Sequence, residues 1–178
     1  QISYLLSCLR EKFSFQPGAE ITMEIDPATF SKSDLEGYLN IGINRLSLGG
    51  QSFDNSILKK VGRSHTKEQL LEACSWLAAV SKTGRLFSWS LDLIQNLPDV
   101  NMNKWKYQLD QAIDTSAPHL SIYDLSLEAG TVFERKYQKG ELNLPNEDLA
   151  AEINEITSDY LSQAGFSRYE ISRYCLPG

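Results

Sequence analysis

The chain contains five short segments in which apolar and polar residues alternate, and helical patterns separate these segments from one another. Alternation with a period of two predicts β-strands, and strands that take turns with helices are typical of an α/β fold with a mainly parallel sheet. A parallel sheet covered by helices on both faces would instead have nearly continuous apolar strands. The predicted strands are 20–26, 43–48, 86–94, 119–125 and 167–173.

One face of the predicted sheet is therefore apolar and the other is polar. Leu46 and Leu48, for example, alternate with Arg45 and Ser47. Buried polar groups without partners cost about 1–3 kcal/mol each, so the polar face needs water or a polar ligand. A partial (β/α) barrel provides both, because its helices cover the outside and its lumen can hold a ligand. The 178 residues suit one such α/β domain.

The polar face carries four candidate site residues near the C-terminal ends of strands, where barrels place their sites. Counting by twos assigns Glu24, Gln51, Asp92 and Glu170 to this face. Glu24 and Asp92 suit the binding of hydroxyls or an amine, or a role as acid and base. Ion pairing with arginines of the same face explains these two carboxylates equally well.

The segment INRLSLGGQSFDNSILKKVGR, residues 43–63, runs from a strand into two glycines. Gly49 and Gly50 leave room for the backbone to approach a ligand closely, and Gln51 presents both a donor and an acceptor beyond them. Arg63 follows twelve residues after Gln51. A plain turn and a surface cation after a short helix are the alternatives for these residues.

Composition excludes several classes of function. The formal net charge is −6 and no basic run occurs, which argues against nucleic acid and anionic membranes as partners. No apolar segment reaches the roughly 18 residues of a membrane span, so we expect a cytoplasmic or plastid stromal protein. Dinucleotide, phosphate-loop and hydrolase motifs are absent from the sequence. Both ends look internal to a longer chain, because Ile2 begins a helical stripe without a cap and the last strand is followed directly by Pro177.

Five segments, in order, resemble the radical S-adenosylmethionine proteins related to oxygen-independent coproporphyrinogen III oxidase. They are EITMEIDPATF, GINRLSLGGQSFDNSILKKVGRSH, SLDLIQNLP, HLSIYDLSLEAGT and RYEISRYCLPG. GRSHT and SIYDLSLEAGT are most similar to the haem chaperone branch, particularly its cyanobacterial and plastid members. The resemblance implies a partial (β/α)6 barrel of the TIM type, of which residues 1–178 would be the central part, incomplete at both ends. It also implies a [4Fe-4S] cluster and S-adenosylmethionine as cofactors.

The resemblance assigns five residues to the S-adenosylmethionine site. Glu24 would bind the methionine amine or the ribose region, and Gln51 would contact the ribose. Arg63 would contact the methionine carboxylate, and Asp92 the ribose hydroxyls. Ser126 matches a position where the family makes a backbone contact to adenine. A zwitterionic amino acid joined to a ribose does need a carboxylate, a cation and a neutral hydrogen-bonding group together.

The sequence departs from the family pattern in two ways. The family's Cys-x3-Cys-x2-Cys motif is absent, so the cluster ligands would lie upstream of Gln1 and no metal ligand is expected in this chain. Cys8, Cys74 and Cys175 are too far apart in sequence to replace that motif. Asn96 stands where the family has Gly, and Gly50 where it has Val; we expect both changes to loosen the backbone of the site.

Three functions remain open at this stage. The haem chaperone branch implies haem binding, delivery to recipient haem proteins and a reductant protein for the cluster; the chain alone would be inactive and would hold no catalytic residue. The dehydrogenase branch implies oxidative decarboxylation of porphyrinogen propionates. A metabolite-binding barrel without radical chemistry is the third. Candidates for a haem ligand are His65, His119, Tyr123 and Cys175.

Overall fold

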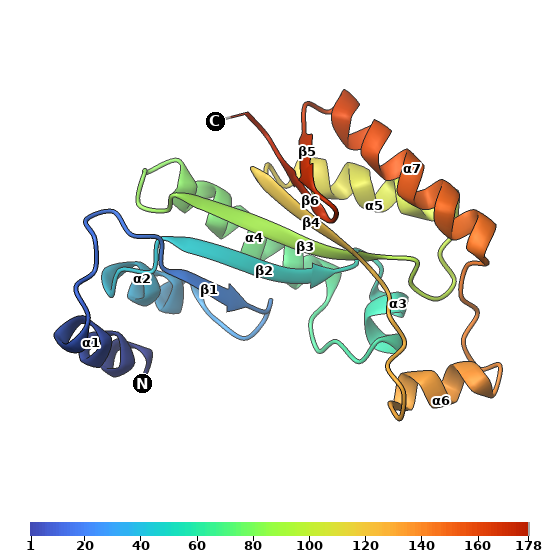
Figure 1. Cartoon of the computed structure of the whole chain (residues 1–178), viewed down its shortest axis with the longest axis horizontal. Helices are drawn as coiled ribbons and strands as arrows, with labels where there is room; N and C mark the ends of the chain where they lie inside the picture. The colour runs from blue at the N-terminus through green and yellow to red at the C-terminus, as the bar shows by residue number, and fades with distance from the viewer. Residues whose placement is uncertain (178) are drawn as a thin grey trace.

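The computed structural model describes residues 1–177 and contains helices and strands in alternation. Figure 1 shows a twisted sheet with α4, α5 and α7 packed behind it and an uncovered face in front. The elements are α1 (Ile2–Lys12), β1 (Thr22–Ile25), α2 (Lys32–Asn40), β2 (Arg45–Gln51), α3 (Asn55–Lys60), α4 (Lys67–Ser81), β3 (Ser88–Gln95), α5 (Met102–Asp114), β4 (His119–Asp124), α6 (Val132–Gln138), α7 (Glu147–Gln163), β5 (Ser167–Glu170) and β6 (Arg173–Cys175).

The strands form one sheet in the order β1-β2-β3-β4-β6-β5. The first four strands are parallel, and β6 joins β4 in the antiparallel direction. The sheet is open within the described residues, since β1 and β5 are its two edges. The structure therefore confirms the predicted α/β fold with a partial barrel.

The alternation in the strands divides the sheet as the sequence predicts. Leu46, Leu48, Leu91 and Leu93 are fully buried on the side of the helices. On the opposite side the hydroxyls of Ser47 and Ser90 lie 2.7 Å apart, across β2 and β3. Burial of the apolar side against the helices thus leaves a polar surface in the concave, uncovered face.

Two helices begin at capping boxes that are visible in the sequence. Ser31 accepts a hydrogen bond from the Asp34 amide at the start of α2, and the Asp34 carboxylate accepts one from the Ser31 amide. Thr66 and Gln69 make the same reciprocal pair at the start of α4. These caps satisfy amide donors that the first turn of a helix leaves free.

The single strand predicted over 167–173 is wrong, because this segment folds into the hairpin of β5 and β6. The Arg168 guanidinium closes the turn by donating to the carbonyl oxygen of Ile171 (Nε to O, 3.1 Å). The Ser172 amide donates to the Glu170 carboxylate at 3.2 Å. Side chain to backbone bonds of this kind compete with a continuous strand. The short helix α6 was also not predicted, and the short helix α3 was predicted only as an alternative for the segment before Arg63.

No helix in residues 1–177 has both the length and the apolar character that crossing a bilayer requires.

Candidate functional site

An ion pair joins the C-terminal end of β1 to the loop after α3. Arg63 Nη1 lies 3.1 Å from Asp26 Oδ1. Gly49 lies beside this pair, and a Cβ atom at that position would come within 2.6 Å of the same Asp26 oxygen. Asp26, Gly49 and Arg63 therefore meet at one point, which only glycine at position 49 permits. Sequence reasoning missed Asp26, although this acid directly follows the β1 pattern and precedes Pro27.

Gln51 has an unusual backbone conformation. Its φ is 61°, and the Ser52 amide bonds to the Gly50 carbonyl at 2.7 Å across it. The register between β2 and β3 shifts between Gly49 and Gln51. The bulge turns the largely buried Gln51 amide back toward Gly49, since Nε2 would lie 3.2 Å from a Cβ there. Residues held at positive φ cost about 1–3 kcal/mol, and they and β-bulges are common beside functional sites.

His65 supports this turn from the side of the helices. Its Nε2 lies 3.1 Å from the Gly50 carbonyl oxygen and its ring is buried. Burial is the main reason that the pKa of His65 lies below its ordinary value. Because Nε2 already bonds the backbone, His65 holds the bulge in place.

Asp92 lies on β3 beside the same strand ends. Its Oδ2 accepts a hydrogen bond from Ser47 Oγ at 2.7 Å, whereas its buried Oδ1 has no partner among the described residues. Burial raises the pKa of Asp92, and the nearby charge of Glu24 raises it further, while serine hydroxyls act in the opposite direction. A buried carboxylate oxygen without a partner is suited to accept a hydrogen bond from a ligand hydroxyl.

The predicted site residues do not all come together. Glu24 is exposed on β1, and its register partner on β2 is Ser47. Ser47 in turn donates a hydrogen bond to Asp92, so Glu24 and Asp92 lie on either side of Ser47. Glu170 lies instead on the far edge strand β5 and pairs with Arg173 at 3.8 Å. The hairpin explains this difference, because β6 separates β5 from β4.

An apolar cavity of about 280 Å³ opens beside Arg63. Ser126 lies at this cavity together with Glu128 and Thr131, so Arg63 and Ser126 line one space although 62 residues separate them. One wall of this cavity is formed by Phe133 of α6. Because α6 was not predicted from the sequence, this wall could not be predicted either. The apolar lining residues are Val61, Ile94, Leu97, Leu125 and Phe133.

The structure shows what surrounds Asn96 and Gly50, and the expected loosening of the backbone there stays a prediction. Asn96 adopts a φ of 60°, and its Nδ2 donates to Asp124 Oδ1 at 2.6 Å, so a side-chain bond holds the conformation that glycine would adopt freely. A Cβ at Gly50 would come within 2.7 Å of Leu91 Cδ1 and 3.1 Å of Leu70 Cδ1. Leucine side chains therefore fill the space that a larger residue would occupy there.

A family model for the radical SAM superfamily matches residues 2–107, which contain β1, β2 and β3 with their strand ends. The chain belongs to this superfamily. It is 40% identical over 174 residues to the Heme chaperone HemW of Synechocystis sp. and 35% identical over 174 residues to that of Escherichia coli. These alignments cover 98% of the chain but only 41% and 44% of the two relatives, so the chain spans less than half of their length.

A solved structure of coproporphyrinogen III oxidase (HemN) from Escherichia coli, a radical SAM enzyme, superposes on the chain with a TM-score of 0.87. The two are 26% identical, and the match covers 99% of this chain and 39% of that one. The open sheet described above thus has the strand arrangement of part of a radical SAM barrel.

The superfamily implies S-adenosylmethionine and a [4Fe-4S] cluster, and the described residues fit only the first. Asp92 offers a buried oxygen without a partner, and Gly49 keeps space free between Asp26 and Gln51. For a cluster the donors do not fit. Among residues 1–177 no three His, Cys, Asp or Glu side chains gather as metal ligands. Cys74 is buried in α4, and burial raises the pKa of its thiol to about 12.

Proposed function

We propose that this chain forms the S-adenosylmethionine-binding part of a haem chaperone of the radical SAM superfamily. The observation that carries the proposal is the 40% identity to a Heme chaperone HemW over 98% of the chain. The strand-end geometry supports it, since a carboxylate, a guanidinium and an amide converge on the space beside Gly49. Residues 1–178 would be the central part of one partial barrel in the cytoplasm or the plastid stroma.

The side chains at the strand ends divide the cofactor between them. Arg63 uses one nitrogen for Asp26 and has further donors for the methionine carboxylate. Asp92 would accept from the ribose hydroxyls through Oδ1, and Gln51 would bond the ribose from the bulge. Glu24 would neutralise the methionine amine at the open end of this row.

Adenine fits the apolar cavity between the ends of β3 and β4. Ile94, Leu97 and Leu125 provide faces for a flat ring, and the backbone at Ser126 provides polar groups for its edge. Bound at a reduced cluster, S-adenosylmethionine supplies a 5′-deoxyadenosyl radical in this superfamily. In the proposed chaperone the ligand is haem, and a reductant protein and recipient haem proteins are its partners.

Calorimetric titration of the intact protein, with any sequence that flanks residues 1–178, tests the cofactor site. Gln51→Ala and Arg63→Ala should each weaken S-adenosylmethionine binding by about tenfold or more, which corresponds to the loss of roughly one charged or well-placed hydrogen bond. Lys59→Ala is the matched control, because Lys59 is an exposed cation on α3 near the same loop. Unchanged affinity in both test variants would contradict the site.

The second candidate function is oxygen-independent coproporphyrinogen III dehydrogenase, which the TM-score of 0.87 to coproporphyrinogen III oxidase favours. The two functions differ in turnover. Anaerobic assays with coproporphyrinogen III, S-adenosylmethionine and a reductant should give no protoporphyrinogen IX, while haem binds the same preparation. Formation of protoporphyrinogen IX would favour the dehydrogenase instead.

A further inference from the structure

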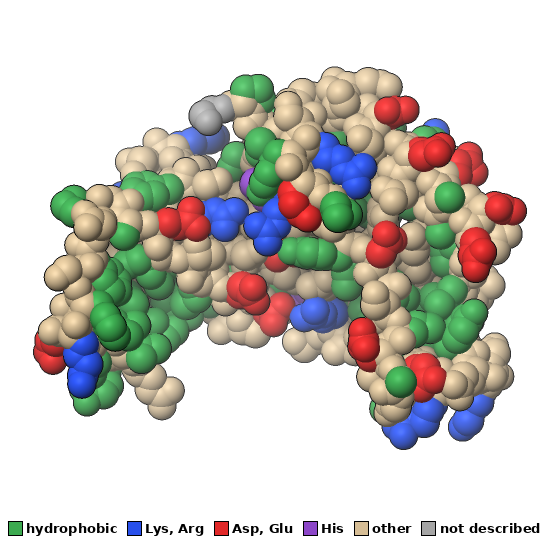
Figure 2. Space-filling model, in the orientation of Figure 1, with side chains coloured by type: hydrophobic (Ala, Val, Ile, Leu, Met, Phe, Trp, Pro, Cys, Tyr) green, Lys and Arg blue, Asp and Glu red, His purple; other side chains and the backbone are tan. Residues whose placement is uncertain are grey.

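A row of basic side chains crosses the open face of the sheet from the start of β2 to the middle of β4, where Ser121 pairs with Arg173. Arg45 begins β2, His119 begins β4 and Arg173 begins β6. Glu20 lies 3.9 Å from Arg45, and Glu170 lies 3.8 Å from Arg173. Figure 2 shows basic side chains gathered in the middle of this face, with acidic side chains on both sides and a histidine beside them. Two positive charges therefore lie toward the centre of the row and their acids lie outside.

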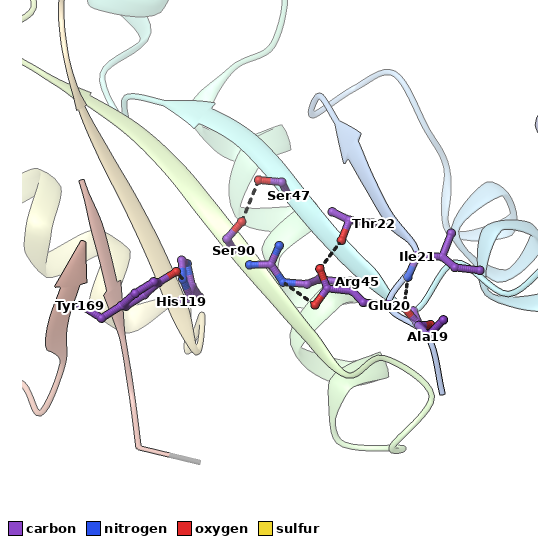
Figure 3. A network of polar contacts seen from close by, with 10 residues as sticks. Ala19, Glu20, Ile21, Thr22, Arg45, Ser47, Ser90, His119 and Tyr169 are labelled. Carbon is purple, nitrogen blue, oxygen red and sulfur yellow. Dashed lines mark hydrogen bonds and ion pairs between the residues drawn. The ribbon is translucent and has the colours of Figure 1, made fainter. Parts of the chain in front are cut away.

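The protein satisfies Arg45 only in part, because the Glu20 carboxylate is 3.9 Å away, beyond hydrogen-bond distance. The Arg45 side chain is only 19% exposed, and no described residue accepts a hydrogen bond from its guanidinium. In Figure 3 this guanidinium reaches along the sheet from β2 toward Ser90, away from its own strand. A guanidinium carries five donors, and a mostly buried one whose single acidic partner is too far for a hydrogen bond is suited to an anionic ligand.

His119 adds a second unsatisfied group to the same place. The ring is 7% exposed, its Nε2 contacts the Tyr169 hydroxyl, and its Nδ1 is buried without a partner among the described residues. Burial, followed by the charges of Arg45 and Arg173, lowers the pKa of His119 to about 4. The ring is therefore neutral at pH 7. A Tyr169 hydroxyl that donates to Nε2 leaves the ring proton on Nδ1, where it can be donated to an anion.

Aromatic side chains lie next to these donors. Tyr123 of β4 is 41% exposed and lies two residues after Ser121, the register partner of Arg173, and Tyr169 of β5 is 55% exposed and contacts His119. Exposed aromatic rings beside cations suit a flat apolar ligand with acidic groups at its edge. The row borders the proposed cofactor site, because Ser121 pairs with both Asp92 and Arg173 and the Ser47 hydroxyl contacts both Ser90 and Asp92.

We propose that Arg45, His119 and Arg173 bind a carboxylate of a flat aromatic ligand that lies on the open face of the sheet. The inference rests on the proposed function, because haem carries such carboxylates as its propionates. It deepens that function by naming the residues on the open face that hold the ligand through its acid groups.

Absorbance titration of the intact protein with haemin and with haemin dimethyl ester tests the inference. The ester keeps the ring and the iron but lacks the negative charges, so the wild type should bind it about tenfold more weakly than the free acid. Arg45→Gln and Arg173→Gln should each weaken haemin by about tenfold and leave the affinity for the ester unchanged. Arg85→Gln is the matched control, because Arg85 is an exposed arginine paired with Glu36 outside this row.

Equal affinity of the wild type for haemin and its ester would overturn the inference, and this comparison needs no variant that could fail to fold. An equal loss of affinity for haemin and for its ester in the arginine variants would also overturn it. That result would mean that the two arginines support the fold and do not bind the carboxylate. Inorganic phosphate is a further probe of the arginine row. If phosphate bound there and left the affinity for haemin unchanged, the row would be a site for a free anion and the inference would be overturned. Absence of any haemin binding would instead contradict the proposed haem chaperone function.

Discussion

Gly49 and Gly50 are adjacent, yet alanine at these two positions should have different consequences. A Cβ at Gly50 would come within 2.7 Å of Leu91 Cδ1 and 3.1 Å of Leu70 Cδ1, in the core between β2 and α4. Overpacking of a filled core costs about 1–3 kcal/mol. Alanine restricts the unfolded chain and returns about 0.4–1 kcal/mol. Gly50→Ala should therefore lower the free energy of unfolding by up to about 2.6 kcal/mol.

A Cβ at Gly49 meets only the ends of side chains, Asp26 Oδ1 at 2.6 Å and Gln51 Nε2 at 3.2 Å. The Asp26 carboxylate can rotate away at the loss of its ion pair with Arg63, which is half-exposed and contributes about 0.2–1 kcal/mol. The gain from alanine in the unfolded state offsets this loss, so Gly49→Ala should leave stability within about 0.5 kcal/mol of the wild type. The added methyl group fills the proposed cofactor space, and S-adenosylmethionine affinity should fall about tenfold.

Urea denaturation of the intact protein and calorimetric titration with S-adenosylmethionine measure these two effects separately. The expected result is a stability loss for Gly50→Ala and an affinity loss with normal stability for Gly49→Ala. If Gly49→Ala were the more destabilising change, the assignment of the two glycines to opposite faces of β2 would be wrong. Unaltered affinity in Gly49→Ala would show that the cofactor does not use the space beside Asp26.

Three further predictions concern stability. The folded pKa of His119, about 4, lies below its ordinary value of 6.5, so unfolding free energy should fall by up to roughly 3 kcal/mol as pH drops from 6.5 to 4; His119→Gln should remove this part of the pH dependence in urea titrations. Thr157→Val deprives buried Trp105 of the acceptor 2.7 Å from Nε1 and should cost about 1–3 kcal/mol, whereas Thr157→Ser keeps the hydroxyl and should cost less in thermal melts. Asp124→Ala should destabilise the protein about 1 kcal/mol more with Asn96 present than in an Asn96→Gly background, and a double-mutant cycle that gives no coupling would contradict the role of their 2.6 Å bond.

The sheet and its two faces could be predicted because alternation reports burial directly. Leu46 and Leu48 are buried and Ser47 faces the open side, as the period of two requires. The starts of α2 and α4 could be predicted because capping boxes are local in sequence. Features that depend on residues close together in the sequence could therefore be predicted.

The features that could not be predicted depend on contacts between residues that are far apart in the sequence. Asp26 belongs to the strand-end cluster only because Arg63, 37 residues away, reaches it. The hairpin at β5 and β6 follows from the Arg168 bonds and from pairing with β4, neither of which has a signal in the pattern of the segment. The side-chain bond of Asn96 could not be predicted for the same reason, since its partner Asp124 lies on the next strand.

The two edges of the sheet differ in how readily another strand could be added. Edge strand β5 carries charged residues, and its register shifts between Arg168 and Glu170, features that discourage pairing with a further chain. Edge strand β1 pairs with β2 in continuous register and has no such irregularity on the described residues. Backbone donors and acceptors along the outer side of β1 thus form a regular template for one more strand. Enlargement of the sheet, within one molecule or between molecules, should begin at β1.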